Sequence, residues 1–323
     1  MTVTGPDPRR PFGRLLTAMV TPFTPDGALD TDGAARLATY LVDEQANDGV
    51  VVNGTTGESP TTTDAEKERL LRAVLEAVGD RAHVVTGVGT NDTAHTIELA
   101  RAAEKAGAHG ALVVTPYYNR PPQSGLLGHF TAVADACGLP IMVYDIPART
   151  GIAIGTETLL RLADHERIVA VKDAKGDLGG TAQVTAHGGV AYYSGDDMAT
   201  LPLLSIGAVG VVGVPTHLFG TRTKAMISAY EAGDITGALA LHHRLLPAYQ
   251  GFFRTQGAIL TKAALTLAGL PAGPVRLPLV DATVAEIARL REDCARAGLT
   301  LGTANRAAAI ESEALVSHHG VAQ

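Results

Sequence analysis

The sequence predicts an α/β protein that folds as a closed (β/α)8 TIM barrel with a C-terminal helical appendage. Short apolar runs rich in β-branched residues recur eight times, and stretches with helical periodicity separate them. Strands that alternate with helices imply parallel βα units, and eight units within about 220 residues match the size of a closed barrel. Several runs are apolar throughout, which is typical of parallel strands buried on both faces.

The elements can be assigned in chain order. The helices are clearest over 63–78 and 92–106, where apolar residues recur at three- and four-residue spacing. An open doubly wound sheet is the structural alternative, but the segment TPFTPDG after the first run lacks the glycine fingerprint of that fold. The candidate strands are LLTAMV at 15, GVVV at 49, HVVTGV at 83, ALVV at 111, PIMVYDI at 140, RIVAVK at 167, VAYYS at 190 and VGVVGV at 209.

More helix follows the eighth strand than a barrel requires. We therefore assign residues 13–231 to the barrel and 232–299 to a C-terminal helical domain. Residues 1–12 and 300–323 are expected to be flexible termini, because the first is polar and broken by proline and the second has few large apolar residues. The predicted late helices lie near 216–231, 234–249, 255–269 and 282–297.

The composition excludes several classes of protein. The chain has 323 residues, 46% of them hydrophobic, which excludes a disordered protein, and its net charge of −7 gives no general reason to bind nucleic acid or an anionic membrane. The start of the chain lacks a signal peptide's apolar region, and the two cysteines lack disulfide-framework or zinc spacing, so we expect a cytoplasmic protein. The uncharged stretch 198–221 is broken by prolines and glycines, which predicts a buried strand and helix and no membrane span. A small soluble metabolite is the expected ligand.

Chemically useful residues gather directly after the predicted strands, where barrels of this kind carry their active sites. GTTGES follows the second strand, TPYYNRP the fourth and YDIPARTG the fifth. Lys172 ends the sixth strand, and SGDD begins at Ser194 after the seventh. We expect these segments to meet at one end of the barrel.

Lys172 is the candidate nucleophile. It ends an otherwise apolar strand, where desolvation of its ammonium would be costly. Burial can lower the pKa of a lysine by several units, and a neutral amine could form a Schiff base with a ketone. The alternative is a lysine that pairs with Asp173, Asp145 or another carboxylate, and position alone does not separate the two.

The neighbouring loops favour chemistry on a small acidic substrate. Tyr117, Tyr118 and Tyr144 could exchange protons in carbinolamine formation and dehydration, although any one of them could simply pack at a strand end. The glycines, threonine hydroxyls and backbone N–H groups of GTTGES could cradle a carboxylate or phosphate, and Arg149 could hold a second carboxylate. Each signal is weak alone.

No metal site is predicted. His242 with His243, and His318 with His319, are adjacent pairs whose side chains diverge, unlike the i, i+4 pairs that chelate metals. Asp196 and Asp197 are expected to cap the helix that follows them.

Taken together, GTTGES, TPYYNRP, YDIPARTG and VKDAKGD resemble the dihydrodipicolinate synthase and N-acetylneuraminate lyase family of class I aldolases, from about residue 14 to 299. The double threonine and YYNRP resemble the synthase branch, which condenses pyruvate with aspartate semialdehyde and needs no cofactor. By that resemblance Lys172 forms the Schiff base with pyruvate. The resemblance implies the remaining roles in the same way. Thr55, Tyr144 and a neighbouring subunit's Tyr118 relay protons, and Thr55 and Thr56 hold the pyruvate carboxylate. Arg149 receives the carboxylate of the semialdehyde, and the backbone carbonyls of Gly195 and Val212 line the lysine pocket.

The resemblance also implies a homotetramer built as a pair of dimers, and it locates departures from the family pattern. Asp145 and Asp173 replace the asparagine and glutamate of many synthases, which leaves the core residues intact. The site at which some members bind inhibitory lysine is less well preserved. Tyr117 and Asn91 are present there, but Asp64 and Lys67 stand at the histidine positions and His95 at the glutamate position. Because the ammonium of lysine loses a partner and gains a like charge, we expect weak or absent inhibition.

Two other functions stay open. One is another pyruvate-dependent aldolase of this family, such as a sialic acid or 2-keto-3-deoxy sugar acid lyase, which would differ in the acceptor pocket around Tyr118 and Arg149. The other is a non-catalytic barrel that binds a keto acid, since a fold alone does not establish activity. The joint presence of Lys172, Thr55, Tyr118 and Tyr144 argues against the second.

Overall fold

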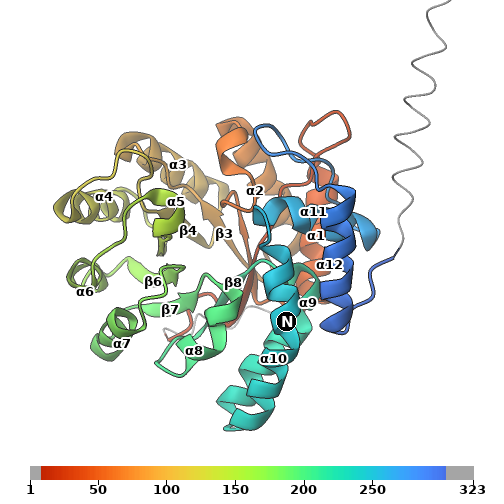
Figure 1. Ribbon diagram of the computed structural model, residues 1–323. Helices are drawn as coiled ribbons and strands as arrows, with labels where there is room; N and C mark the ends of the chain where they lie inside the picture. Colours follow the sequence, from red (N-terminus) through yellow and green to blue (C-terminus); the bar gives the residue numbers. More distant parts are fainter. Residues whose placement is uncertain (1–8, 303–323) are drawn as a thin grey trace, which may run out of the picture.

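The computed structural model describes residues 9–302 and shows a closed barrel of eight parallel strands, ordered around the barrel as in the chain (Figure 1). This confirms the predicted fold class, and every predicted strand is present. The strands are β1 Leu15–Ala18, β2 Gly49–Val52, β3 His83–Gly87, β4 Gly110–Val114, β5 Ile141–Asp145, β6 Ile168–Asp173, β7 Ala191–Ser194 and β8 Gly210–Gly213.

Helices surround the barrel and continue beyond it on one side (Figure 1). Up to β8 they are α1 Thr31–Asp43, α2 Asp64–Val78, α3 Thr93–Ala106, α4 Gln123–Ala136, α5 Pro147–Thr150, α6 Thr156–Ala163, α7 Leu178–His187 and α8 Thr200–Leu204, with 3-10 turns η1 Ser59–Thr61 and η2 Asp197–Ala199. After β8 follow α9 Thr216–Glu231, α10 Ile235–Phe252, α11 Gly257–Leu267 and α12 Val284–Arg296.

The two clearest predicted helices begin at side-chain caps. Thr63 and Glu66 form a capping box at α2, in which each side chain accepts a hydrogen bond from the other residue's backbone N–H. The Asp92 side chain accepts a hydrogen bond from the N–H of Ala94 at the start of α3. Both helices start one residue after the predicted position, because the predicted first residue is the cap itself.

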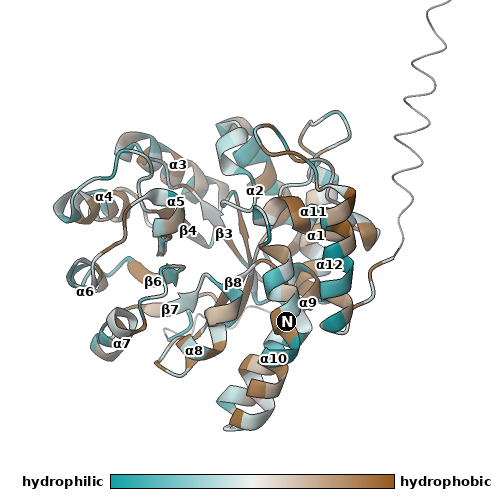
Figure 2. Cartoon of the chain, viewed as in Figure 1, coloured by the Kyte–Doolittle hydropathy of each residue, from teal (hydrophilic) through white to brown (hydrophobic). Residues whose placement is uncertain are grey.

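Alternation along each strand separates two cores. Inward residues such as Leu16, Val51 and Met142 pack against one another inside the barrel. Outward residues such as Val50 and Val143 pack against the surrounding helices. The cartoon shows apolar residues in several strands, and apolar residues that alternate with hydrophilic ones along the helices (Figure 2). The predicted burial of strands on both faces is therefore confirmed.

The start of the described chain closes one end of the barrel. Phe12 is buried in the barrel interior, with its ring edge-to-face with His83 at 6.0 Å between centroids. Arg10 forms an ion pair with Glu231 at the end of α9. The last residues of the segment 1–12, which was expected to be flexible, are therefore packed against the barrel, and residues 1–8 lie outside the described residues. At the other terminus Leu301 is buried, and residues 303–323 of the expected tail lie outside the described residues.

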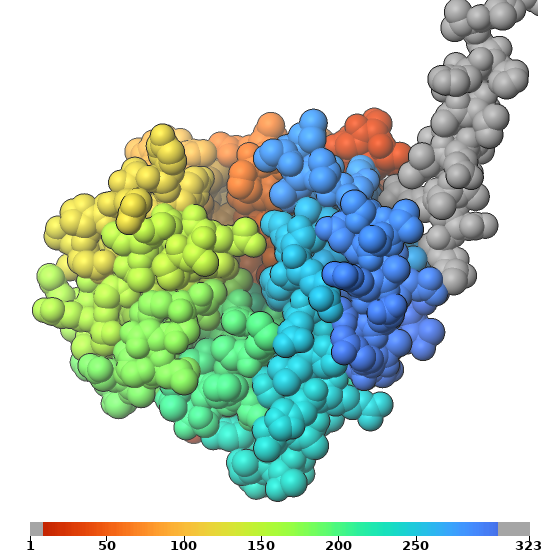
Figure 3. Space-filling view, viewed as in Figure 1, coloured from red at the N-terminus to blue at the C-terminus, as the bar shows by residue number. Residues whose placement is uncertain are grey.

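The last three helices form a continuous side of the molecule next to the barrel (Figure 3). Residues 232–234 connect α9 to α10, and Gly233 takes a positive φ of 82° in this turn. We keep this turn as the proposed boundary between the barrel (13–231) and the helical appendage (232–299). The stretch 198–221 contains η2, α8, β8 and the start of α9, as its segmentation predicts. Within residues 9–302, no helix is long and apolar enough to cross a membrane.

Candidate active site

Lys172 and Tyr144 lie side by side inside the barrel. They are register partners on the neighbouring strands β5 and β6, and both point inward because they share the parity of Met142 and Ala170. The ammonium of Lys172 lies 4.2 Å from the centroid of the Tyr144 ring. Only 5% of Lys172 and 4% of Tyr144 are exposed, so both groups are shielded from water.

The surroundings of Lys172 increase the neutral fraction of its amine. Burial is the largest influence and lowers the pKa of Lys172 to about 8, with a smaller lowering from Arg149. Asp197 acts in the opposite direction. No carboxylate of the described chain lies within ion-pair distance of its ammonium, and Asp145 and Asp173 occupy outward-facing strand positions. The alternative reading, a lysine paired with either aspartate, is therefore wrong.

Asp197 is a site residue that the sequence did not reveal. Asp196 caps η2 as expected, accepting a hydrogen bond from the N–H of Met198. Asp197 is instead buried, and its carboxylate accepts a hydrogen bond from the N–H of Val214 beyond β8. Burial raises the pKa of Asp197 to about 7. The cap expected at Asp197 is wrong, because the turn after β7 directs its side chain toward β8. The sequence alone does not reveal this contact, because it joins the ends of two strands that lie apart in the chain.

The lowered pKa gives a pH prediction. At pH 7 a lysine of ordinary pKa has roughly one neutral molecule in several thousand, whereas a pKa of about 8 leaves about a tenth of Lys172 neutral. The rate of imine formation at low pyruvate should therefore rise with pH and level off above about pH 8. Single-turnover borohydride trapping across a pH series measures this rate. A rate that still climbs steadily through pH 10 would contradict the lowered pKa.

The threonine loop after β2 lies against the phenol of Tyr144. The hydroxyl of Thr21 donates a 2.6 Å hydrogen bond to the carbonyl of Gly57 and so fixes the loop. Burial raises the pKa of Tyr144 to about 12, with smaller opposing effects from Arg149 and the Thr55 side chain. A phenol with this pKa is protonated at neutral pH, so it can donate a proton to an oxygen held beside it and recover it through Thr55. Thr56, which follows, is buried.

A buried ion pair ties this loop to the C-terminal helices. The Glu58 carboxylate lies 2.6 Å from the ammonium of Lys262 on α11, and both side chains are almost completely buried. Lys262 also donates to the carbonyl of Pro274 and lies over the ring of Phe23. Glu58 has a positive φ of 55°, which the pair and the surrounding contacts impose on a residue other than glycine. The helical appendage thus holds the end of the GTTGES segment in place.

A cavity of about 210 Å³ opens where these loops meet. It is large enough for a small metabolite, and Arg149 on the short helix α5 lies on its rim beside the phenol and the threonine loop. The described chain therefore brings together Thr55, Tyr144 and Arg149 around one space. Lys172 does not line this space itself, and its ammonium lies 4.2 Å from the centroid of the Tyr144 ring. The lining consists of Asn53, Gly54, Thr55, Ser59, Pro60, Gly87, Gly89, Leu112, Val114, Tyr117, Tyr144, Ile146, Arg149 and Thr150.

The tyrosine after β4 that lines this cavity is Tyr117. Tyr118, which the resemblance places in the proton relay, is 90% exposed and has a positive φ of 72°. Its side chain therefore does not join the cavity of its own chain. Gly195 lies against Lys172, because a Cβ at Gly195 would come within 3.0 Å of the Lys172 Cγ. Val212 lies inside the barrel on β8.

The two adjacent histidine pairs of the sequence lie on α10 and near the end of the chain. His242 and His243 have ring centroids 6.2 Å apart, and His242 packs near Tyr249 in α10. Residues 9–302 contain no group of three or more His, Cys, Asp or Glu side chains that could hold a metal ion. His318 and His319 lie outside the described residues.

Comparison with known proteins gives one consistent result. Residues 11–296 match the family model of the dihydrodipicolinate synthetase family. The chain is 75% identical over 290 residues to a 4-hydroxy-tetrahydrodipicolinate synthase of Acidothermus cellulolyticus, covering 90% of this chain and 94% of the relative. It is 64% identical over 294 residues to 4-hydroxy-tetrahydrodipicolinate synthase 2 of Streptomyces coelicolor, covering 91% and 98%.

A solved structure agrees with these relatives. The crystal structure of DHDPS from Cyanidioschyzon merolae with lysine bound superimposes with a TM-score of 0.87 at 43% identity, over 89% of this chain and 99% of that one. The family model, the relatives and the structure all extend over the barrel and the helical appendage together. The chain belongs to the dihydrodipicolinate synthetase family.

Proposed function

We propose that this protein is a Schiff-base-forming lyase, a 4-hydroxy-tetrahydrodipicolinate synthase that condenses pyruvate with L-aspartate 4-semialdehyde in diaminopimelate and lysine biosynthesis. The observation that carries the proposal is the buried Lys172, with its lowered pKa, against Tyr144 at the edge of a small cavity. The curated relatives at 75% and 64% identity carry the name of this enzyme.

The chemistry follows from the neutral amine. Lys172 attacks the ketone carbon of pyruvate, and the resulting carbinolamine loses water to give a protonated imine. This imine withdraws electrons from the adjacent methyl group, which loses a proton and becomes an enamine. The enamine carbon then attacks the aldehyde carbon of the second substrate and forms the new carbon–carbon bond, while the aldehyde oxygen takes up a proton and becomes a hydroxyl. The amino group of the aspartate semialdehyde portion then adds to the regenerated imine carbon and displaces the Lys172 amine, which closes the ring of the product and frees the lysine. The imine itself is the electron sink, so the proposal includes no cofactor.

Each predicted residue has a role in this scheme. Tyr144 and Thr55 pass the protons that carbinolamine formation and dehydration require, which the shielded phenol beside Lys172 supports. Thr55 and Thr56 hold the pyruvate carboxylate, and Arg149 on the cavity rim receives the carboxylate of the semialdehyde. The carbonyls of Gly195 and Val212 line the lysine pocket.

The third relay residue comes from a neighbouring subunit in this proposal. Tyr118 does not line the cavity of its own chain and is almost fully exposed, which suits a side chain that completes the site of a second copy. We therefore propose that the active form is at least a dimer, and that it is a homotetramer built as a pair of dimers. We also propose that it acts in the cytoplasm.

A coupled assay tests the function. Purified protein receives pyruvate and aspartate semialdehyde with dihydrodipicolinate reductase in excess, and oxidation of NADPH is followed. We expect turnover that requires both substrates. If pyruvate were trapped by borohydride while the semialdehyde gave no turnover, the acceptor assignment would be wrong and a sugar-derived aldehyde would replace it. If trapping occurred with no aldehyde turned over, the non-catalytic barrel would be favoured.

We further propose that lysine inhibits this enzyme weakly or not at all. The residues at the positions of the regulatory site pair with one another: the His95 ring lies 2.8 Å from one Asp64 oxygen, and the Lys67 ammonium lies 3.8 Å from the other. A lysine ligand would meet the Lys67 charge and find Asp64 already engaged. Activity measured in increasing lysine hydrochloride, against sodium chloride of equal concentration, should stay nearly constant. Half-inhibition at sub-millimolar lysine would refute this expectation.

A further inference from the structure

We propose that Lys175 and Asp145 together form a positioning device, which holds the loop between β5 and α6 and thereby fixes Arg149 for the carboxylate of the acceptor aldehyde. The inference rests on the role proposed above for Arg149. Neither residue lines the cavity, so both would act through the loop.

The device begins directly beside the residues that do the chemistry. Asp145 follows Tyr144 on β5, and Asp173 follows Lys172 on β6. The two aspartates lie opposite each other in the strand register, as Tyr144 and Lys172 do. Alternation along the strands directs both aspartates outward, into the layer between barrel and helices. Asp145 is completely buried there, so its carboxylate requires partners within the protein.

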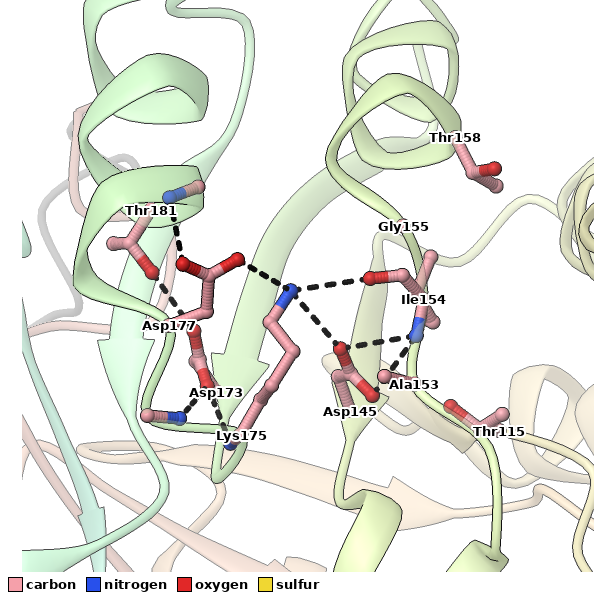
Figure 4. A network of polar contacts seen from close by, with 12 residues as sticks. Thr115, Asp145, Ala153, Ile154, Gly155, Thr158, Asp173, Lys175, Asp177 and Thr181 are labelled. Atoms are coloured by element: carbon pink, nitrogen blue, oxygen red, sulfur yellow. Dashed lines mark hydrogen bonds and ion pairs between the residues drawn. The ribbon is translucent and has the colours of Figure 1, made fainter.

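Asp145 and Lys175 contact the two backbone polar groups of Ile154, its N–H and its carbonyl (Figure 4). The N–H of Ile154 donates to both carboxylate oxygens of Asp145, each at 3.2 Å. The ammonium of Lys175 donates to the carbonyl of Ile154 at 3.1 Å and lies 3.5 Å from the Asp145 carboxylate. The ion pair between Asp145 and Lys175 therefore supplies hydrogen-bond partners for both backbone polar groups of the buried residue Ile154.

Lys175 is itself anchored from β6. The N–H of Lys175 donates a 2.6 Å hydrogen bond to one oxygen of Asp173. The other oxygen of Asp173 accepts hydrogen bonds from Thr181 and Tyr192, each at 2.9 Å. Asp177 lies 4.0 Å from the ammonium, on the side opposite to Ile154 (Figure 4). The lysine is thus held by the strand that carries the nucleophile.

The consequence for Arg149 follows from the path of the chain. The loop leaves β5 at Asp145 and returns at Ile154, so the contacts of the Asp145 carboxylate join its two ends. The short helix α5 within it carries Arg149, which is exposed and not fixed by packing of its own side chain. The position of the guanidinium therefore depends on the backbone beneath it. Loosening the Ile154 end would displace a group that must meet a carboxylate in a defined geometry.

The test separates the two substrates. Lys175→Met removes the ammonium and keeps most of the length of the side chain. We expect the KM for aspartate semialdehyde to rise between about 10-fold and 100-fold, the scale on which a displacement of about 1 Å acts in other enzymes. The KM for pyruvate and the rate of borohydride trapping with pyruvate alone should stay within about twofold, because Lys172 is not disturbed. Lys175→Arg should recover most of the loss, since it restores the charge.

Two further variants guard against a general effect of destabilisation. Asp145→Asn keeps the shape and the hydrogen bond to Ile154 but removes the charge, so it should raise the KM for the semialdehyde in the same direction and by less. Lys224→Met is the matched control: it breaks an ion pair with Asp48, which immediately precedes β2 at the opposite end of the barrel. It should lower thermal stability and change neither KM.

The outcomes are distinct. Equal rises in both KM values, or no rise in Lys175→Met, would overturn the positioning role while wild-type turnover left the proposed function standing. A KM effect that persists with a neutral aldehyde lacking the carboxylate would also overturn it, since Arg149 would then not be the group affected. If the wild-type protein trapped pyruvate and did not turn over the semialdehyde, both the acceptor assignment and this inference would fail together.

Discussion

Replacing Lys172 with alanine is expected to reduce kcat by about 10⁴-fold to 10⁶-fold, the scale on which loss of a covalent nucleophile acts in other enzymes. The reason is that the remaining groups could still bind pyruvate but could not form the imine that makes its methyl group acidic. Steady-state turnover in the coupled assay measures the loss. Borohydride should trap no pyruvate on the variant.

Lys172→Arg is the matched variant for this experiment. It keeps a positive charge at the end of β6 and supplies no nucleophilic amine. We expect it to be as inactive as the alanine variant. Substantial turnover in Lys172→Arg would show that the charge, and not the amine, carries the reaction, which would contradict the Schiff-base mechanism.

Tyr144→Phe is expected to reduce kcat by about 10²-fold to 10⁴-fold, the usual contribution of a positioned proton donor. The phenylalanine keeps the ring that lies against the Lys172 ammonium, so the pocket keeps its shape while the hydroxyl that faces Thr55 is lost. The KM for pyruvate should change much less than kcat, because the groups proposed to hold its carboxylate remain. Full kinetics with each substrate varied in turn provide the measurement.

Tyr193→Phe serves as the control for this change. Tyr193 is a second buried tyrosine inside the same barrel, but its hydroxyl donates to the carbonyl of Gly13 at the opposite end. Removing that hydroxyl should lower stability by about 1 kcal/mol and leave kcat unchanged. If both tyrosine variants lost activity to the same extent, the effect of Tyr144→Phe would reflect packing and not proton transfer.

The barrel could be predicted from the sequence because its signals are local. Runs such as GVVV at 49 are apolar throughout, and helices such as 63–78 carry their own periodicity and cap. The same holds for Lys172. Its apolar strand predicts that the lysine is buried, and its position at the end of the strand predicts that it lies at the C-terminal end of the barrel. The sequence pattern was less informative at the start of the chain, because the burial of Phe12 depends on barrel residues that are far from it in the sequence.

The rest of the site depends on contacts between distant segments. Glu58 and Lys262 meet only because the C-terminal helices fold back onto the loop after β2. Asp197 is directed toward Val214 by a turn whose geometry the sequence SGDD does not specify. For Asp145 the sequence showed a substitution within a familiar pattern and suggested a candidate partner for Lys172. Its actual partner is Lys175, and that ion pair depends on how β5 lies beside β6.

The central claim is that Lys172 carries pyruvate as an imine. The most direct test is to incubate the wild-type protein with pyruvate, reduce it with borohydride, digest it and locate the modified residue by mass spectrometry. The account predicts one modified lysine, Lys172, and no modification without pyruvate. Modification at Lys175, Lys262 or another lysine, with Lys172 intact, would contradict it.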